Sequence, residues 1–145
     1  MSTLESRPRG HYALRHTADI QIEAWAPTRE ECVEEAVSAL VEEIADLPGK
    51  REQRVETWFP VPDAKDAELL MMVLDEVIYR MGTTGQIPVR THVSARDEDG
   101  LDVIQWVVDS EVAGQVNMPP GGISLHGLTF AAGETGWRCG LVLER

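Results

Sequence analysis

Apolar residues recur along the first third of the chain with two different periods. Over residues 11–25, Ile20, Ile22 and Ala24 alternate with other side chains, which predicts two short strands or one long bent strand. Over residues 28–47, apolar residues recur at spacings of three and four, which predicts an amphipathic helix. The apolar stripe of this helix consists of Val33, Ala36, Val37, Leu40, Val41 and Ile44.

Start and stop signals support this helix and predict a second one. Thr28 and Glu31 form a capping box, in which the Thr28 hydroxyl accepts from the Glu31 N–H and the Glu31 carboxylate reaches back. Pro48-Gly49 ends the helix. The second helix is predicted over residues 66–81 with Gly82 as its stop, and its run of consecutive apolar residues predicts burial on most sides.

The remaining segments are rich in strand signals. Two hairpins are predicted around the turns at residues 97–100 and 133–136. The alternation of strands with two helices, followed by strands, predicts an α+β domain with both helices on one face of a sheet. Residues 1–10 are expected to be a flexible tail, and residues 11–145 one domain. The later strands are predicted at residues 53–61, 89–95, 103–108, 123–131 and 137–143.

Charge and composition restrict the classes of partner. The formal net charge is −12, from 25 acidic and 13 basic residues, which argues against direct stable binding to nucleic acid. An acidic surface fits a basic partner protein or a cation, and it also serves solubility alone. No apolar run approaches the roughly 20 residues that cross a bilayer, and the first ten residues contain no secretory core, so a cytoplasmic protein is expected. Cys32 and Cys139 lack metal-site spacing and are predicted to be packing residues.

A few polar side chains are candidates for chemistry. Asp19 lies within a predicted strand beside a likely loop and could ligate a hard cation if the terminal strand paired with this one and brought Glu144 close. The alternative is that Asp19 only accepts hydrogen bonds from a turn. His16 and His126 could ligate a metal or transfer protons, although half-buried histidines bonded to the backbone are more common. Glu76 and the acidic side of the first helix could face a partner or only solvent.

The sequence contains no Ser-His-Asp order, HExxH motif or Walker motif. A metal-dependent hydrolase therefore ranks behind a binding or accessory protein.

Four segments in order resemble the archease family over nearly the whole chain. The most specific is His16-Thr17-Ala18-Asp19-Ile20, followed by the acidic helix that ends at Ala45-Asp46-Leu47. The others are Asp66-Ala67-Glu68-Leu69-Leu70 with Leu74-Asp75-Glu76, then Ser124-Leu125-His126-Gly127-Leu128, and the strand that begins at Trp137.

The resemblance implies a two-helix, β-rich single domain with an inserted strand region. It also implies a protein cofactor, not an enzyme, that assists the GTP-dependent RNA ligase of tRNA splicing and RNA repair. Such proteins promote guanylylation of the ligase histidine and allow multiple turnover. They bind a divalent metal, calcium in crystals, with manganese or magnesium as alternatives.

Residue by residue, Asp19 matches the family's first metal ligand, and Glu144 stands where the family has Asp. The main-chain carbonyl of Arg145 could complete the site. Further candidates for partner contact within the resembling segments are His16, Asp46, Glu76 and His126.

One further departure separates the chain from the family pattern: Gly121 replaces a basic residue. Together with Glu144, it supports an alternative, in which the chain is a diverged archease-like module that binds another partner or a nucleotide without activating a ligase.

Overall fold

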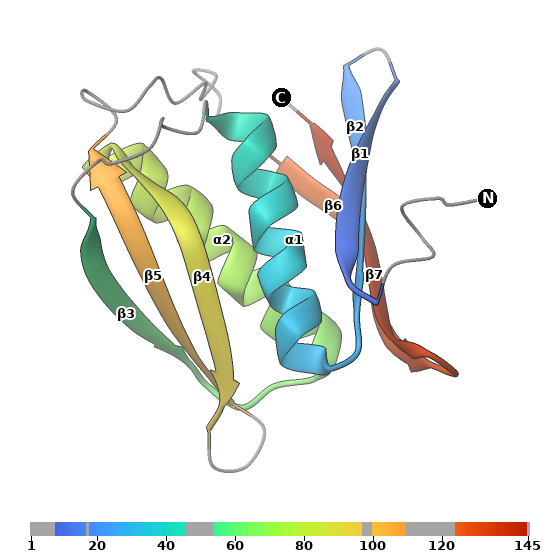
Figure 1. Ribbon diagram of the computed structural model, residues 1–145. Coiled ribbons are helices and arrows are strands. Elements are labelled where there is room, and N and C mark those ends of the chain that lie inside the picture. The colour runs from blue at the N-terminus through green and yellow to red at the C-terminus, as the bar shows by residue number, and fades with distance from the viewer. Residues whose placement is uncertain (1–7, 17, 46–53, 97–99, 110–123, 145) are drawn as a thin grey trace.

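Two antiparallel sheets enclose two helices in the computed structural model (Figure 1). The structure describes residues 8–16, 18–45, 54–96, 100–109 and 124–144. The helices are α1 (Arg29–Ile44) and α2 (Asp66–Thr84). The strands are β1 (Gly10–His16), β2 (Asp19–Ala26), β3 (Val55–Val61), β4 (Gln86–Ala95), β5 (Leu101–Asp109), β6 (Ser124–Gly133) and β7 (Gly136–Glu144).

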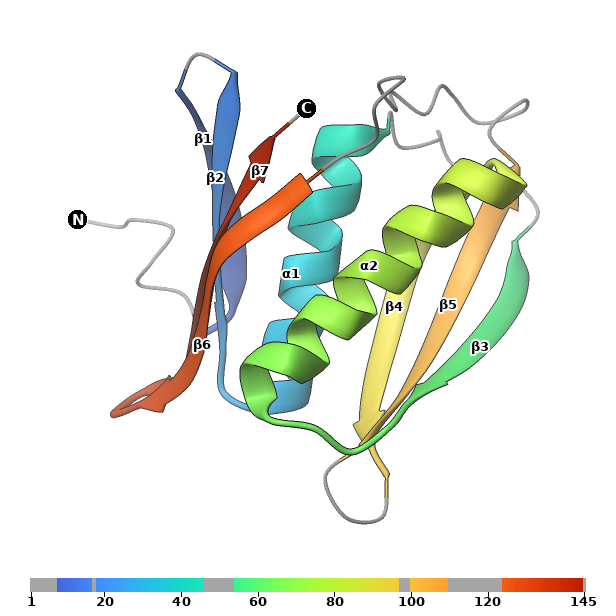
Figure 2. The same cartoon turned by 180° about the vertical axis from the view of Figure 1, so that it is seen from behind.

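The strands form a first sheet of order β1-β2-β7-β6 and a second sheet of order β3-β5-β4. Figures 1 and 2 show the helices between the two sheets, and α1 contacts both β2 and β4. The predicted α+β class is confirmed, whereas the prediction of helices on one face of a single sheet is wrong. Periodicity identifies the buried face of each strand but not its neighbours, so it does not separate one sheet from two.

Helix α1 begins as the capping box predicts, with one difference. The Glu31 N–H donates to the Thr28 hydroxyl oxygen at 3.1 Å. The Thr28 hydroxyl in turn donates to the Glu31 carboxylate at 2.9 Å, so in the structure that carboxylate bonds the cap side chain. The start of α1 is thus fixed by local bonds between these two residues.

Replacing the cap residue, Thr28→Ala, is expected to lower the free energy of unfolding by about 1 kcal/mol, because the Glu31 N–H loses its acceptor. Urea denaturation measures this difference. Thr28→Ser retains the hydroxyl and is the matched control. Equal stability of the alanine variant and the wild type would show that the cap contributes nothing.

Helix α2 extends beyond the predicted stop at Gly82. It continues to Thr84 and ends at Gly85, whose φ of 70° lies in the left-handed region that glycine tolerates. The Thr83 and Thr84 hydroxyls donate to carbonyl oxygens one turn earlier, at 2.8 and 2.6 Å. These hydrogen bonds lie in the last turn of α2. The helix therefore ends at Gly85 and not at Gly82. Among the described residues, no helix combines the length and apolarity that a membrane crossing requires.

The acidic side of α1 faces basic groups of the same chain. Arg9 donates to three carboxylates of α1, and His11 lies 2.8 Å from Glu35 and 3.1 Å from Glu42. Arg15 pairs with Glu43 at 2.9 Å. This side of α1 is therefore covered by β1 and by Arg9, which directly precedes β1. The sequence pattern did not predict this cover. The carboxylates that Arg9 contacts belong to Glu31, Glu34 and Glu35.

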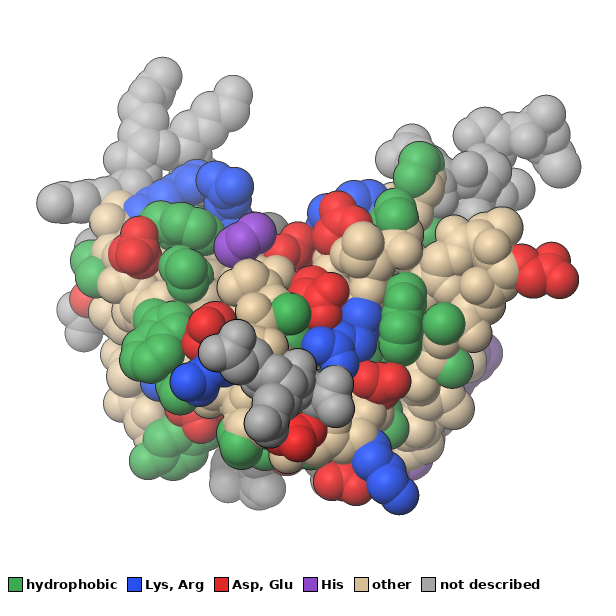
Figure 3. All heavy atoms as spheres, turned by 90° about the horizontal axis from the view of Figure 1, so that it is seen from below, with side chains coloured by type: hydrophobic (Ala, Val, Ile, Leu, Met, Phe, Trp, Pro, Cys, Tyr) green, Lys and Arg blue, Asp and Glu red, His purple; other side chains and the backbone are tan. Residues whose placement is uncertain are grey.

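Charged side chains of both signs also lie close together on another part of the surface (Figure 3). Seen from below, acidic side chains lie among basic and apolar ones and do not form one continuous acidic patch (Figure 3). On the face that Figure 3 shows, the acidic side chains are therefore dispersed among other residues.

His11 makes stability depend on pH. Hydrogen bonds to Glu35 and then Glu42 raise its pKa from 6.5 to about 9. The stabilisation is complete below pH 6.5, where the imidazole is protonated in both states, and it is lost as the pH rises through 9. Because the ring is partly exposed, we expect a loss of about 1–2 kcal/mol.

Urea unfolding at pH 6 and pH 9.5, compared between the wild type and His11→Gln, measures this contribution. The wild type should lose more stability than the variant over this interval. Parallel losses in both proteins would contradict the assignment to His11.

Candidate functional site

One end of the first sheet brings together residues that are far apart in the sequence. His16 is the register partner of Asp19, Asp19 that of Glu144, and Glu144 that of Ser124. Register partners point to the same face of a sheet, so these four side chains form one row across β1, β2, β7 and β6. The terminal strand therefore pairs with the N-terminal one, which is the condition under which Asp19 and Glu144 could form a carboxylate pair.

This row lies on the face of the sheet that points away from the helices. The next residues along the strands, Ile20 and Leu143, are buried at 3% and 0% exposure. Because side chains alternate between faces, Asp19 and Glu144 point outward. Asp19 is half-buried, whereas His16 and Glu144 are exposed, so solvent reaches the pair.

His126 approaches the same row diagonally. Its Nε2 atom lies 3.2 Å from Glu144 Oε1, although the register partner of His126 is Val142. A register shift follows His126, at Gly127, whose φ of 63° is one that glycine accepts readily. The structure thus joins two predicted site residues, Glu144 and His126, in one contact.

The donor atoms suit a hard divalent cation in part. Carboxylate oxygens are the ligands that Ca²⁺, Mg²⁺ and Mn²⁺ prefer, and Mg²⁺ often takes one or two carboxylates with several waters. Within the described residues, no group of three or more His, Cys, Asp or Glu side chains is placed to hold a metal. Asp19 and Glu144 are register partners that each supply carboxylate oxygens, and Arg145 lies outside the described residues.

The other predicted site residues are not part of this row. Glu76 lies on α2 and pairs with Arg80 at 2.7 Å. Asp46 lies outside the described residues, as do Thr17 and the loop that contains Gly121. Among the described candidates, the structure therefore brings together His16, Asp19, Glu144 and His126 and leaves Glu76 apart.

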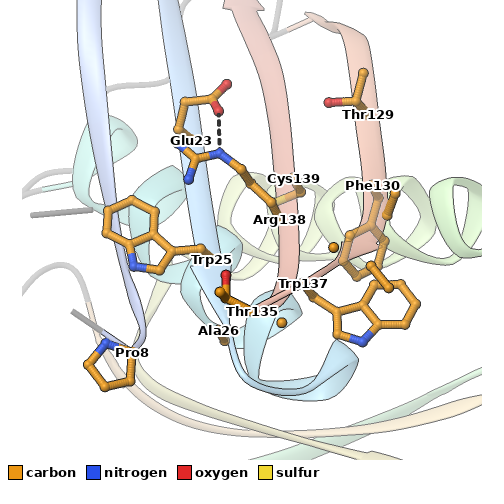
Figure 4. Close-up of a pocket in the computed structure, with 14 residues that line it drawn as sticks. Pro8, Glu23, Trp25, Ala26, Thr129, Phe130, Thr135, Trp137, Arg138 and Cys139 are labelled. Atoms are coloured by element: carbon orange, nitrogen blue, oxygen red, sulfur yellow. Dashed lines mark ion pairs between the residues drawn. The ribbon is translucent and has the colours of Figure 1, made fainter. Parts of the chain in front are cut away.

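A second feature of the first sheet was not predicted from the sequence. A cavity of about 600 Å³ lies toward the other end of the sheet, near the β6–β7 turn (Figure 4). Glu23 pairs with Arg138 at 3.4 Å, and the Arg138 guanidinium lies 5.4 Å from the centre of the Trp25 ring. The charges in this cavity balance each other. Strand alternation in the sequence places Glu23 and Trp25 on one face of β2. It does not show that Arg138 of β7 lies beside them, because that depends on the register between β2 and β7.

Comparisons with known proteins agree with each other. The profile of the Archease protein family matches residues 12–144. The chain is 40% identical over 136 residues to a "Probable protein archease" of Mycobacterium tuberculosis, covering 93% of this chain and 74% of that protein.

Solved structures show the same fold. The crystal structure of an archease, described as a possible chaperone, from Thermotoga maritima has a TM-score of 0.59 at 19% identity and covers 91% of this chain and 94% of that one. The solution structure of a Methanobacterium thermoautotrophicum protein has a TM-score of 0.58 at 18% identity and covers 94% and 99%. The match over residues 12–144 and the 40% identity to a curated relative lead to one conclusion: the chain belongs to the archease family.

Proposed function

We propose that this protein is an accessory protein that activates a GTP-dependent RNA ligase in tRNA splicing or RNA repair. It promotes transfer of GMP to the ligase histidine and allows the ligase to turn over repeatedly, in the cytoplasm and without acting as an enzyme itself. Membership of the archease family supports this role at the level of the family. The observation that carries it for this chain is the position of Asp19 directly opposite Glu144.

The proposed role of the carboxylate pair is to hold a divalent cation at the outer end of the first sheet. Asp19 and Glu144 would be its protein ligands, because both point outward and supply hard oxygen donors. Such a cation supplies positive charge that neutralises phosphate oxygens. His126, 3.2 Å from Glu144, would orient that carboxylate.

The experiment is multiple-turnover ligation by the RNA ligase of the same organism, with GTP and Mn²⁺, with and without this protein in substoichiometric amount. The proposal predicts that ligated product exceeds the amount of ligase only when the protein is present. A ligase that completes one turnover but gains nothing from the protein would contradict it.

The contact between His126 and Glu144 favours a second candidate function. The imidazole contacts one of the two Glu144 oxygens and leaves fewer oxygen donors open to a cation, which suits a diverged archease-like module that binds another partner or a nucleotide. Unchanged ligation in the experiment above would support this candidate.

A further inference from the structure

A groove of about 590 Å³ separates β3 from α2 on the second-sheet side of the molecule. Its walls are mainly apolar and include Phe59, Val61 and Met72 together with the Tyr79 ring. In both ribbon views β3 and the first sheet lie on opposite sides of the helices (Figures 1 and 2). The groove is therefore a surface separate from the row that contains Asp19 and Glu144.

A large exposed aromatic side chain, that of Tyr79, lines this groove. Tyr79 of α2 is 64% exposed, the highest value among the large apolar side chains of the described residues, whereas the exposed Val55 and Trp58 of β3 do not line the groove. Apolar side chains also gather on the β3 side of the molecule in the view from below (Figure 3). Aromatic side chains exposed beside a hollow are typical of the centre of a protein–protein interface.

The charges in the groove leave one carboxylate without a partner. Arg80 is engaged by Glu76 at 2.7 Å and lies over the Phe59 ring at 4.7 Å. Within the described part of the chain, the Asp75 carboxylate makes no hydrogen bond or ion pair. Partial burial raises the pKa of Asp75, so the nearby apolar wall disfavours its charge. A cation from a partner would compensate this cost.

We propose that this groove is the surface that holds the RNA ligase, by receiving an apolar side chain of the ligase beside a Lys or Arg that pairs with Asp75. The assignment rests on the proposed function. A protein that binds RNA presents basic residues, which complement the unpaired carboxylate and the overall charge of −12. The groove then supplies affinity, and the opposite side of the molecule supplies activation.

The test measures the Kd for the purified ligase and the concentration of this protein that gives half-maximal stimulation. Tyr79→Ala and Asp75→Lys should each raise both values about tenfold or more, with full stimulation recovered at high concentration. Leu14→Ala removes another large exposed apolar side chain, at 49% exposure on the first sheet, and should have little effect. Glu134→Lys makes the same change of charge as Asp75→Lys, at an exposed turn, and should also have little effect.

Asp19→Ala separates the two surfaces, because it should bind the ligase with unchanged Kd and fail to stimulate it. Thermal unfolding of every variant shows whether the fold is retained. If the wild type stimulates the ligase and both groove variants bind as tightly as it does, this assignment is overturned and the proposed function stands. If the wild type neither binds nor stimulates the ligase, both are overturned.

Discussion

Asp19→Ala is expected to bring multiple-turnover ligation down toward the level of the ligase alone. Asp19 is half-buried at the start of β2 and lies directly opposite Glu144. Removing its carboxylate leaves Glu144 as the remaining member of the pair, which is too few for a site in which two carboxylates share a hydrated cation. We expect the stimulation to fall on the order of 10–100-fold.

The control for this variant is Gln21→Ala, which changes an exposed residue on the same strand and the same face. It should stimulate the ligase normally. Asp19→Asn keeps the size of the side chain and removes its charge, so it should behave like Asp19→Ala. Stimulation by Asp19→Ala equal to that of the wild type would show that the carboxylate pair is not needed to activate the ligase.

Gly136→Ala is expected to lower the free energy of unfolding by about 2–3 kcal/mol. Gly136 follows the turn between β6 and β7 with a φ of 139°, a conformation that other residues rarely adopt. A Cβ atom at this position would lie 2.5 Å from the Ala26 carbonyl oxygen and 3.1 Å from the Pro27 Cα. Because both neighbours are backbone atoms, the strands themselves would have to shift.

Urea denaturation of Gly136→Ala and of Gly133→Ala measures this effect against a matched control. A Cβ atom at Gly133 would lie 3.8 Å from the Gly136 carbonyl oxygen, which is an ordinary van der Waals contact. The Gly133 variant should therefore stay close to the wild type. Equal losses of stability in the two variants would show that the backbone at Gly136 is not specially constrained.

Local signals in the sequence were sufficient to predict the elements of the fold. The alternation of Ile20, Ile22 and Ala24 marks the buried side of β2, and the stripe of α1 is buried as its spacing predicts. The end of α2 was predicted three residues early, because Gly82 is compatible with a helix and the left-handed residue is Gly85. Local patterns therefore give the type of an element more reliably than its boundary.

The site could be predicted only in part. From the sequence, the pairing of β2 with β7 was only the condition under which Glu144 would approach Asp19, and the structure shows this pairing. The contact of His126 with Glu144 depends on the register shift at Gly127, which no spacing in the sequence reveals.

The interactions that the sequence did not reveal all join distant elements. Arg9 contacts carboxylates of α1 that lie 22 to 26 positions further along the chain. The groove beside Tyr79 depends on how β3 of the second sheet lies against α2. Such contacts follow from the arrangement of the sheets around the helices, and propensity and periodicity describe only the elements themselves.

The most direct measurement of the central claim is the fraction of ligase molecules that carry GMP, determined by intact mass after one round of ligation with GTP present. We expect the fraction of ligase that carries GMP to rise again when the wild-type protein is added and to remain low when Asp19→Ala is added. A fraction that is the same with and without the wild-type protein would contradict the claim that this archease promotes guanylylation of the ligase.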